Sequence, residues 1–229
     1  MSTRELSINP TSTASLPAAT IAFTSAGAFL ILLTLLHLLK PDLDPSWRFI
    51  SEYAIGQYGW LMVVAFLAVA TSFAMLFVAI RPHCRTIVGR IGLTMLLISA
   101  VSLVVAAIFP TDPITTPFDQ ATTNGTIHNI AGMFGFAMTF SMIFVSWRLL
   151  RNPQWTAARF AVWLAMIVGI GGFILSFGSL MVYTTQENVV FGPDVPVGWP
   201  TRIEIVTIAL WLMTISWQAK KIEDKHGSR

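Results

Sequence analysis

Six long apolar stretches alternate with shorter polar segments along the chain. The stretches cover residues 20–39, 57–80, 87–109, 127–147, 160–183 and 201–219, and they contain almost no charged side chains. Each has the length of about 20 residues that an α-helix needs to cross the hydrocarbon core of a bilayer. Apolar residues lie on all sides of each predicted helix, which is typical of helices surrounded by lipid and by each other. The pattern therefore predicts six membrane-spanning helices.

Composition agrees with a membrane protein. Hydrophobic residues make up 55% of the chain and charged residues 11%, whereas a soluble domain carries about 25% charged residues. We therefore expect an all-α integral membrane bundle at 20–219, between a disordered tail at 1–19 and a basic tail at 220–229. No small-residue cleavage site follows the first stretch, so we expect that stretch to stay as a helix. Cys84 is the only cysteine, which excludes an intramolecular disulfide and a cysteine-based metal site.

The basic residues predict the orientation. With the N-terminus in the cytoplasm, eleven of the fourteen Lys and Arg residues fall on the cytoplasmic side, and only Lys40, Arg48 and Arg202 fall outside. Cytoplasmic loops carry the excess of Lys and Arg in membrane proteins. We therefore expect both termini in the cytoplasm of a cell whose plasma membrane holds the protein. The basic groups then face anionic lipid head groups, and we expect membrane lipids, not nucleic acid, as partners.

Polar side chains collect at one level, at the outer ends of the predicted helices, while no Asp, Glu or Lys lies at mid-depth. Ion pumps usually place ionisable groups within the span, so the pattern argues against an ion-coupled pump. Residues far apart in the chain would meet at the outer face of a compact bundle and form a polar site there. The candidate residues are Ser51, Glu52, Asp112, His128, Arg202 and Glu204.

Two kinds of ligand suit these residue types. Three predicted helix N-termini point outward at this level, and their N–H groups and dipoles favour anions. Arg202, Lys40 and a protonated His128 would add positive charge for a phosphate-like head group. The carboxylates and imidazoles could instead bind a divalent metal such as zinc, which would activate a water molecule. The candidate metal ligands are His37, Glu52, Asp112 and His128, and the residues leave open whether the protein is an enzyme.

Each candidate also has a purely structural explanation. A lone histidine near a membrane interface, such as His128, is more often structural than a ligand. Thr201 and Glu204 have the spacing of a capping box at the start of the last helix. Asp112, between Thr111 and Pro113, is a typical turn residue. Ser51 or Asn124 could cap the helix that follows it. Arg202 could simply pair with Asp112 or Glu52.

The order and spacing of four motifs resemble a known family. The motifs are Ser51-Glu52 before the second helix, FPTDP at 109–113, the histidine of GTIHN at His128, and the segment 198–204 that leads into the last helix. Together they resemble the domain of unknown function 998 family, a large prokaryotic family of six-span membrane proteins. Because the activity of that family is not established, the resemblance implies a fold and a membrane location but no reaction.

Three functions are compatible with these observations. The first is handling of a lipid or amphiphile head group at the polar cluster on the extracytoplasmic face. The second is an accessory role in which the loops bind another envelope protein. The third is transport of a small solute, which the charge-free interior and the lack of internal repeats disfavour.

The orientation can be tested by labelling with a membrane-impermeant maleimide. We expect the reagent to label a cysteine placed at Gln120 from outside and to leave Cys84 unlabelled. Labelling of Cys84 in intact cells would contradict the predicted orientation.

Overall fold

The computed structural model describes residues 15–185 and 190–227, and within them every regular element is helical. The all-α class predicted from the sequence is therefore confirmed. Short 3₁₀ helices sit in the connections. The α-helices are α1 (Leu16–Leu39), α2 (Gly59–Ile80), α3 (Ile87–Ile108), α4 (Thr123–Phe134), α5 (Phe136–Leu150), α6 (Arg159–Thr184) and α7 (Gly198–Gly227), and the 3₁₀ helices are η1 (Ile50–Ala54), η2 (Arg81–His83), η3 (Phe118–Gln120) and η4 (Pro153–Ala158).

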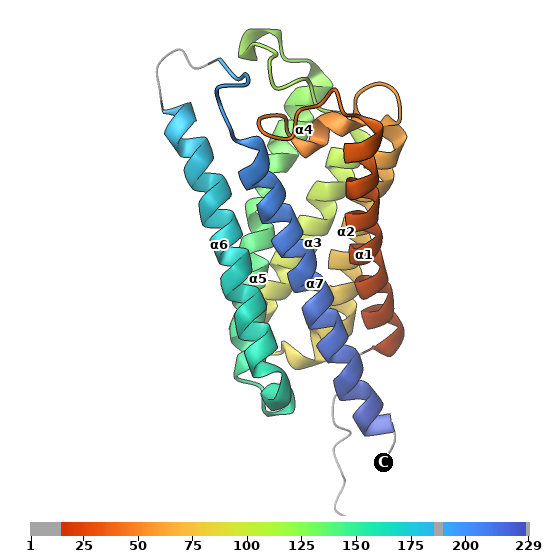
Figure 1. Cartoon of the computed structure of the whole chain (residues 1–229). Coiled ribbons are helices and arrows are strands. Elements are labelled where there is room, and N and C mark those ends of the chain that lie inside the picture. The colour runs from red at the N-terminus through yellow and green to blue at the C-terminus, as the bar shows by residue number, and fades with distance from the viewer. Residues whose placement is uncertain (1–14, 186–189, 228–229) are drawn as a thin grey trace, which may run out of the picture.

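The long helices form a closed ring. Following the packing contacts, α1 lies against α2, α2 against α3, α3 against α5, α5 against α6, and α6 against α7, which returns to α1 (Figure 1). The three long connections, 40–58, 109–122 and the segment before Gly198, lie together at one end of the bundle, which we call the loop end. The opposite end carries η2, η4 and the last turns of α7.

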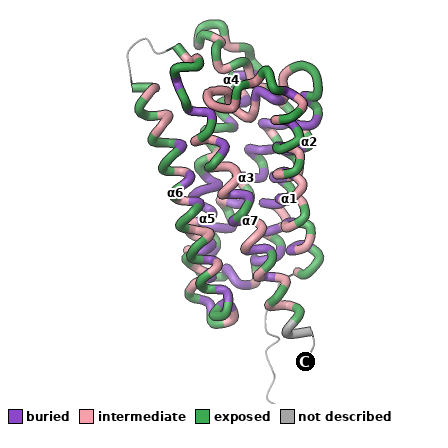
Figure 2. The backbone as a smooth tube through the Cα atoms, in the orientation of Figure 1, coloured by how far each residue is buried: buried purple, intermediate pink, exposed green. Residues whose placement is uncertain are grey.

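Large side chains point both into the ring and away from it. Phe29, Met62, Phe73 and Trp211 are fully buried in one continuous core. Other large apolar side chains, such as Phe160 at 74% exposure, lie on the outside of the helices. Figure 2 shows buried and exposed positions along the same helices. A soluble protein rarely exposes extended apolar surface, so this arrangement is that of a bundle embedded in lipid.

Five segments of the described chain are helical, long and apolar enough to cross a membrane. They are Leu16–Leu39, Gly59–His83, Ile87–Ile108, Thr123–Leu150 and Pro153–Thr184. The sixth span predicted at 201–219 belongs to α7, which packs against α1 and α6. Charged residues in the first turns of α7 and from Lys220 onward leave it less apolar overall. The sixth crossing therefore stays a prediction.

The helix predicted at 127–147 is interrupted. The chain forms α4, makes a single turn at Gly135 and continues as α5. The N–H group of Gly135 donates to the carbonyl of Gly132 at 2.8 Å, which is the tighter 3₁₀ spacing. Glycine is a weak helix former, so the two glycines three residues apart provide the physical reason for the break.

The helices extend beyond the predicted bundle of 20–219 at both ends. Helix α1 begins at Leu16, so 16–19 are helical, and α7 continues through most of the predicted basic tail to Gly227. Residues 1–14 of the predicted N-terminal tail, and the acidic residue Glu187, lie outside the described residues.

Because Cys84 is buried, the labelling experiment requires cysteines at other positions. Its side chain is fully buried, and this burial raises the pKa of the thiol to about 12. Because the thiolate is the reactive form, Cys84 would stay unlabelled in either orientation.

A better pair, in a Cys84→Ala background, is Gln120→Cys at the loop end and Ala157→Cys at the opposite end, both at exposed positions. We expect the maleimide to label Gln120→Cys alone in intact cells, and both sites after permeabilisation; labelling of Ala157→Cys in intact cells would contradict the predicted orientation.

Candidate functional site

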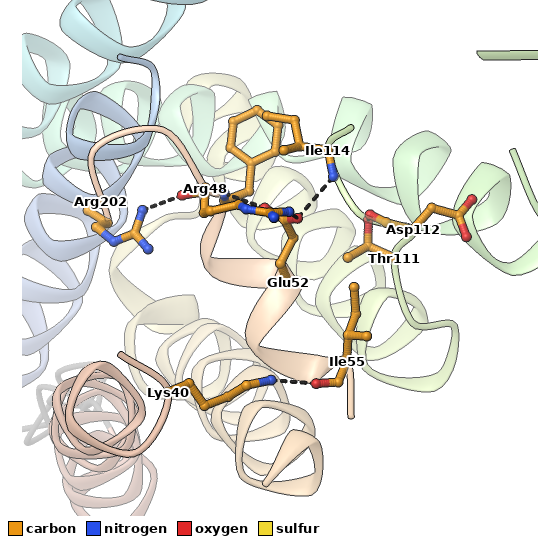
Figure 3. Close-up of polar contacts among 9 residues, drawn as sticks. Lys40, Arg48, Glu52, Ile55, Thr111, Asp112, Ile114 and Arg202 are labelled. Atoms are coloured by element: carbon orange, nitrogen blue, oxygen red, sulfur yellow. Dashed lines mark hydrogen bonds and ion pairs between the residues drawn. The ribbon is translucent and has the colours of Figure 1, made fainter. Parts of the chain in front are cut away.

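The carboxylate of Glu52 is the centre of the polar cluster at the loop end. Glu52 lies in η1 and is only 1% exposed. One oxygen accepts from the guanidinium of Arg48 at 2.7 Å and from the backbone N–H of Ile114 at 2.9 Å, and the other accepts from the N–H of Phe49 at 2.9 Å (Figure 3). A buried carboxylate is costly unless it is paired and hydrogen-bonded. These contacts meet that requirement and join two loops that are 62 residues apart in the chain.

Arg202 joins α7 to α1 and to the same loop. It lies in the second turn of α7 and is 3% exposed. Its guanidinium donates to the Nε2 atom of His37 at 2.9 Å, to the backbone carbonyl of Arg48 at 2.5 Å, and to the hydroxyl of Tyr53 at 3.3 Å. A further bond reaches the carbonyl of Gly198 in its own helix. All three guanidinium nitrogens are thus used inside the protein, and neither Asp112 nor Glu52 is the partner expected from the sequence.

Lys40 holds the end of α1 against η1. Its ammonium donates to the backbone carbonyl of Tyr53 and to that of Ile55, the contact drawn in Figure 3. Burial lowers the pKa of this ammonium, while the negative charges of Asp42 and Glu52 act to raise it. Lys40, like Arg202, therefore donates to atoms of the protein at the loop end.

Asp112 closes the loop that precedes α4. Its two carboxylate oxygens accept from the N–H group and the hydroxyl of Thr122, at 2.8 and 2.9 Å. Thr122 also caps α4, since its hydroxyl oxygen accepts from the N–H of Gly125. A Cβ atom at Gly125 would collide with the Asp112 carboxylate, so the close approach requires glycine. Thr122, not Asn124, is the N-cap of α4.

His128 lies in the second turn of α4 and faces α3. Its Nδ1 atom donates to the carbonyl of Phe109 at 2.8 Å and contacts that of Ala106 at 3.2 Å. These are carbonyls at the C-terminal end of α3, which lack partners within their own helix. The ring also packs against Phe66 at a centroid distance of 6.0 Å. His128 thus joins α4 to the end of α3.

Among the described residues, the other two candidates, Ser51 and Glu204, form no side-chain hydrogen bond with Glu52, Asp112, His128 or Arg202. Ser51 is half-buried in η1 beside Glu52 and makes none of the cluster's hydrogen bonds among the described residues. Glu204 is half-buried in α7, with Ser176 of α6 as its polar neighbour. The expected capping box is wrong, because α7 begins at Gly198 and the Thr201 hydroxyl donates backwards to the carbonyls of Val197 and Gly198.

The proposed metal ligands are not gathered around one point. Within the described residues, no three His, Cys, Asp or Glu side chains come close enough together to hold a metal ion. His37 has both ring nitrogens engaged, because Nδ1 donates to the carbonyl of Leu33 and Nε2 accepts from Arg202. Glu52 binds backbone N–H groups and Arg48, and Asp112 binds Thr122. In Figure 3 the Asp112 carboxylate points away from Glu52.

Sequence reasoning missed Arg48 and Tyr53. Arg48 forms the ion pair with Glu52 that had been considered for Arg202. Tyr53 is fully buried, and its ring packs against His37 at a centroid distance of 5.1 Å. The spacing of Arg48 and Glu52 would suggest a pair on one helical face, but the segment between them showed no helical pattern.

A cavity of about 480 Å³ opens beside this cluster. Asp112 and Asn129 supply its amide and carboxylate groups, and Thr111, Thr115 and Thr116 supply hydroxyls. The remaining walls are apolar and come from Phe49, Pro113, Ile114, Pro117, Ala121, Val190 and Phe191. Two of these wall residues, Phe49 and Ile114, are those whose backbone N–H groups bind Glu52.

Comparison with known proteins identified one family. A family model with the description "Protein of unknown function (DUF998)" matches residues 23–218. Among curated proteins and solved structures, none matches the chain.

Glu52→Gln tests whether the hydrogen bonds of the Glu52 carboxylate stabilise the loop end. A glutamine has one acceptor oxygen where Glu52 uses two, so at least one buried donor would lose its partner. Breaking a buried ion pair in this way costs about 3 kcal/mol of unfolding free energy, and we expect a clearly lower melting temperature in detergent. Asp119→Asn, at an exposed acidic position in η3, is the matched control and should melt like the wild type. Equal melting of the two variants would contradict the role given to Glu52.

Proposed function

The chain belongs to the family of proteins of unknown function DUF998, and from its own loop-end cavity we propose that it binds the head group of a membrane amphiphile. The Lys and Arg distribution along the sequence predicts that this cavity faces the extracytoplasmic side.

The observation that carries the proposal is the mixed lining of the cavity. Hydroxyl, amide and carboxylate groups share it with aromatic and aliphatic walls. Ligand sites in proteins typically combine a mostly apolar lining with a few placed polar groups. A head group with an attached hydrocarbon chain matches both kinds of wall, whereas a small inorganic ion matches only one.

The walls of the cavity are held in place before a ligand arrives. Glu52 fixes Phe49 and Ile114 through their N–H groups, and Asp112 fixes the end of the loop through Thr122. Preorganised walls lower the entropy cost of binding. In this proposal Glu52, Arg202 and His128 position the cavity, and Asp112 and Asn129 contact the ligand.

The charges favour a hydroxylated or amine-bearing head group. None of the described residues that line the cavity is Lys or Arg, and Asp112 is its acidic residue. Lys40 and Arg202, which the sequence suggested for phosphate, donate to atoms of the protein itself. A phosphate at this place would therefore meet a carboxylate without a facing cation.

Three amphiphiles with the same dodecyl chain and different head groups test the proposal. The purified protein, transferred to amphipol, is melted with dodecyl glucoside, dodecylamine or dodecyl phosphate below their micellar concentrations. We expect the glucoside or the amine to raise the melting temperature, because a ligand at one hundred times its Kd adds about 2.7 kcal/mol to the free energy of unfolding. The dodecyl phosphate should have little effect on the melting temperature.

Two asparagines of α4 provide matched variants. Asn129 lines the cavity and Asn124 does not, although both are exposed. Asn129→Ala should weaken binding about tenfold through loss of a hydrogen bond, and Asn124→Ala should bind like the wild type. If all three amphiphiles stabilise both variants equally, the head-group site is wrong, and an accessory role of the loops in binding another protein becomes the better explanation.

A further inference from the structure

A second cavity, of about 590 Å³, lies at the end of the bundle opposite the loop end. Three arginines line it: Arg81 in η2, Arg85 in the following turn, and Arg90 in the first turn of α3. Leu93 and Thr94 of α3 continue its wall towards the middle of the bundle. The cavity therefore has a cationic outer part and a less polar inner part.

The three arginines have no acidic partner in the part of the chain that the structure describes. There, the single ion pair within 4.0 Å joins Arg48 to Glu52, at the loop end. Arg148 of α5 adds a fourth positive charge nearby, since its field acts on the thiol of Cys84 in the wall of this cavity. Among the described residues, positive charge is concentrated in this cavity and no carboxylate forms an ion pair with it.

An apolar groove continues from this cavity along the outside of the bundle. It has a volume of about 580 Å³ and lies between α3 and α4, with walls that include Leu97, Val101, Ile130 and Phe134. Thr94 lines both the basic cavity and the groove, so the two are contiguous. From Thr94 to Val105 the groove follows α3 for about 17 Å, at the helical rise of about 1.5 Å per residue.

We propose that this composite site binds an anionic phospholipid, with the phosphate among Arg81, Arg85 and Arg90 and one acyl chain in the groove. Guanidinium groups match phosphate through paired hydrogen bonds, and basic pockets between membrane helices recognise anionic head groups. The apolar groove distinguishes a lipid from free phosphate, because only the lipid has an acyl chain that can occupy it. The site is separate from the loop-end cavity, so either proposal can fail without the other.

The simpler explanation is that these arginines only set the orientation of the chain. Loops on the cytoplasmic side are generally rich in Lys and Arg, and diffuse charge of that kind attracts any anionic lipid. The two explanations differ in one respect: orientation requires charge anywhere on this side, whereas a lipid site requires charge in this cavity and an open groove beside it.

The experiment compares charge-matched double variants. Arg85→Gln/Arg90→Gln removes two charges from the cavity, and Arg151→Gln/Arg159→Gln removes two from the same end outside it. Binding of dioleoyl phosphatidylglycerol and dioleoyl phosphatidylcholine to delipidated protein is measured by native mass spectrometry. We expect the wild type to prefer phosphatidylglycerol, and the cavity variant to lose about fivefold of this preference per arginine, about 25-fold in all. The control variant should keep most of the preference.

A groove variant and a chain-free anion complete the test. Val101→Trp fills the groove without changing charge, and we expect it to weaken phosphatidylglycerol binding; Ile31→Trp, at an exposed position of α1 away from the groove, should not. Inorganic phosphate should compete poorly with the lipid. Equal losses in the two double variants, unchanged binding to Val101→Trp, or full competition by phosphate would each overturn the proposal.

Discussion

The loop end of this protein depends on one buried carboxylate, that of Glu52. A carboxylate at 1% exposure is costly to bury unless hydrogen-bond donors replace the water that it has lost. The donors come from Arg48 and Phe49 just before it and from Ile114 in a distant loop. The hydrogen bonds to this one carboxylate therefore fix the relative position of two long connections. They also fix the walls of the neighbouring cavity.

Arg202 has the complementary role on the other side of the same loop. Its donors reach α1 through His37, η1 through Tyr53, and the loop through the carbonyl of Arg48. Carbonyl dipoles and neutral side chains, and no carboxylate of the described residues, solvate this buried cation. Because α7 begins where Gly198 docks on the backbone of Ser46, these bonds hold the last helix in the ring between α1 and α6.

The two ends of the bundle differ in how their charges are used. At the loop end, Lys40, Arg48 and Arg202 all donate to the protein, and the open cavity beside them carries a carboxylate. At the opposite end, three arginines face a cavity without carboxylate partners among the described residues. The first set is held by hydrogen bonds within the protein, and the second set has no ion pair with any of the described residues. Residue type alone did not reveal this difference.

The sequence by itself determined that the chain is a bundle of membrane helices, and it placed Glu52, Asp112, His128 and Arg202 near helix ends at one level. The reason is local: in lipid the backbone must satisfy its own hydrogen bonds, so a long apolar stretch is bound to be helical wherever it lies. The break at Gly135, the pairing of Glu52 with Arg48 and Ile114, and the use of His128 to hold α3 were decided by the tertiary structure. Hydrogen-bond partners up to 165 residues apart, as for Arg202 and His37, depend on which helices pack together. Hydrophobic periodicity does not encode that choice, because every face of these helices is apolar.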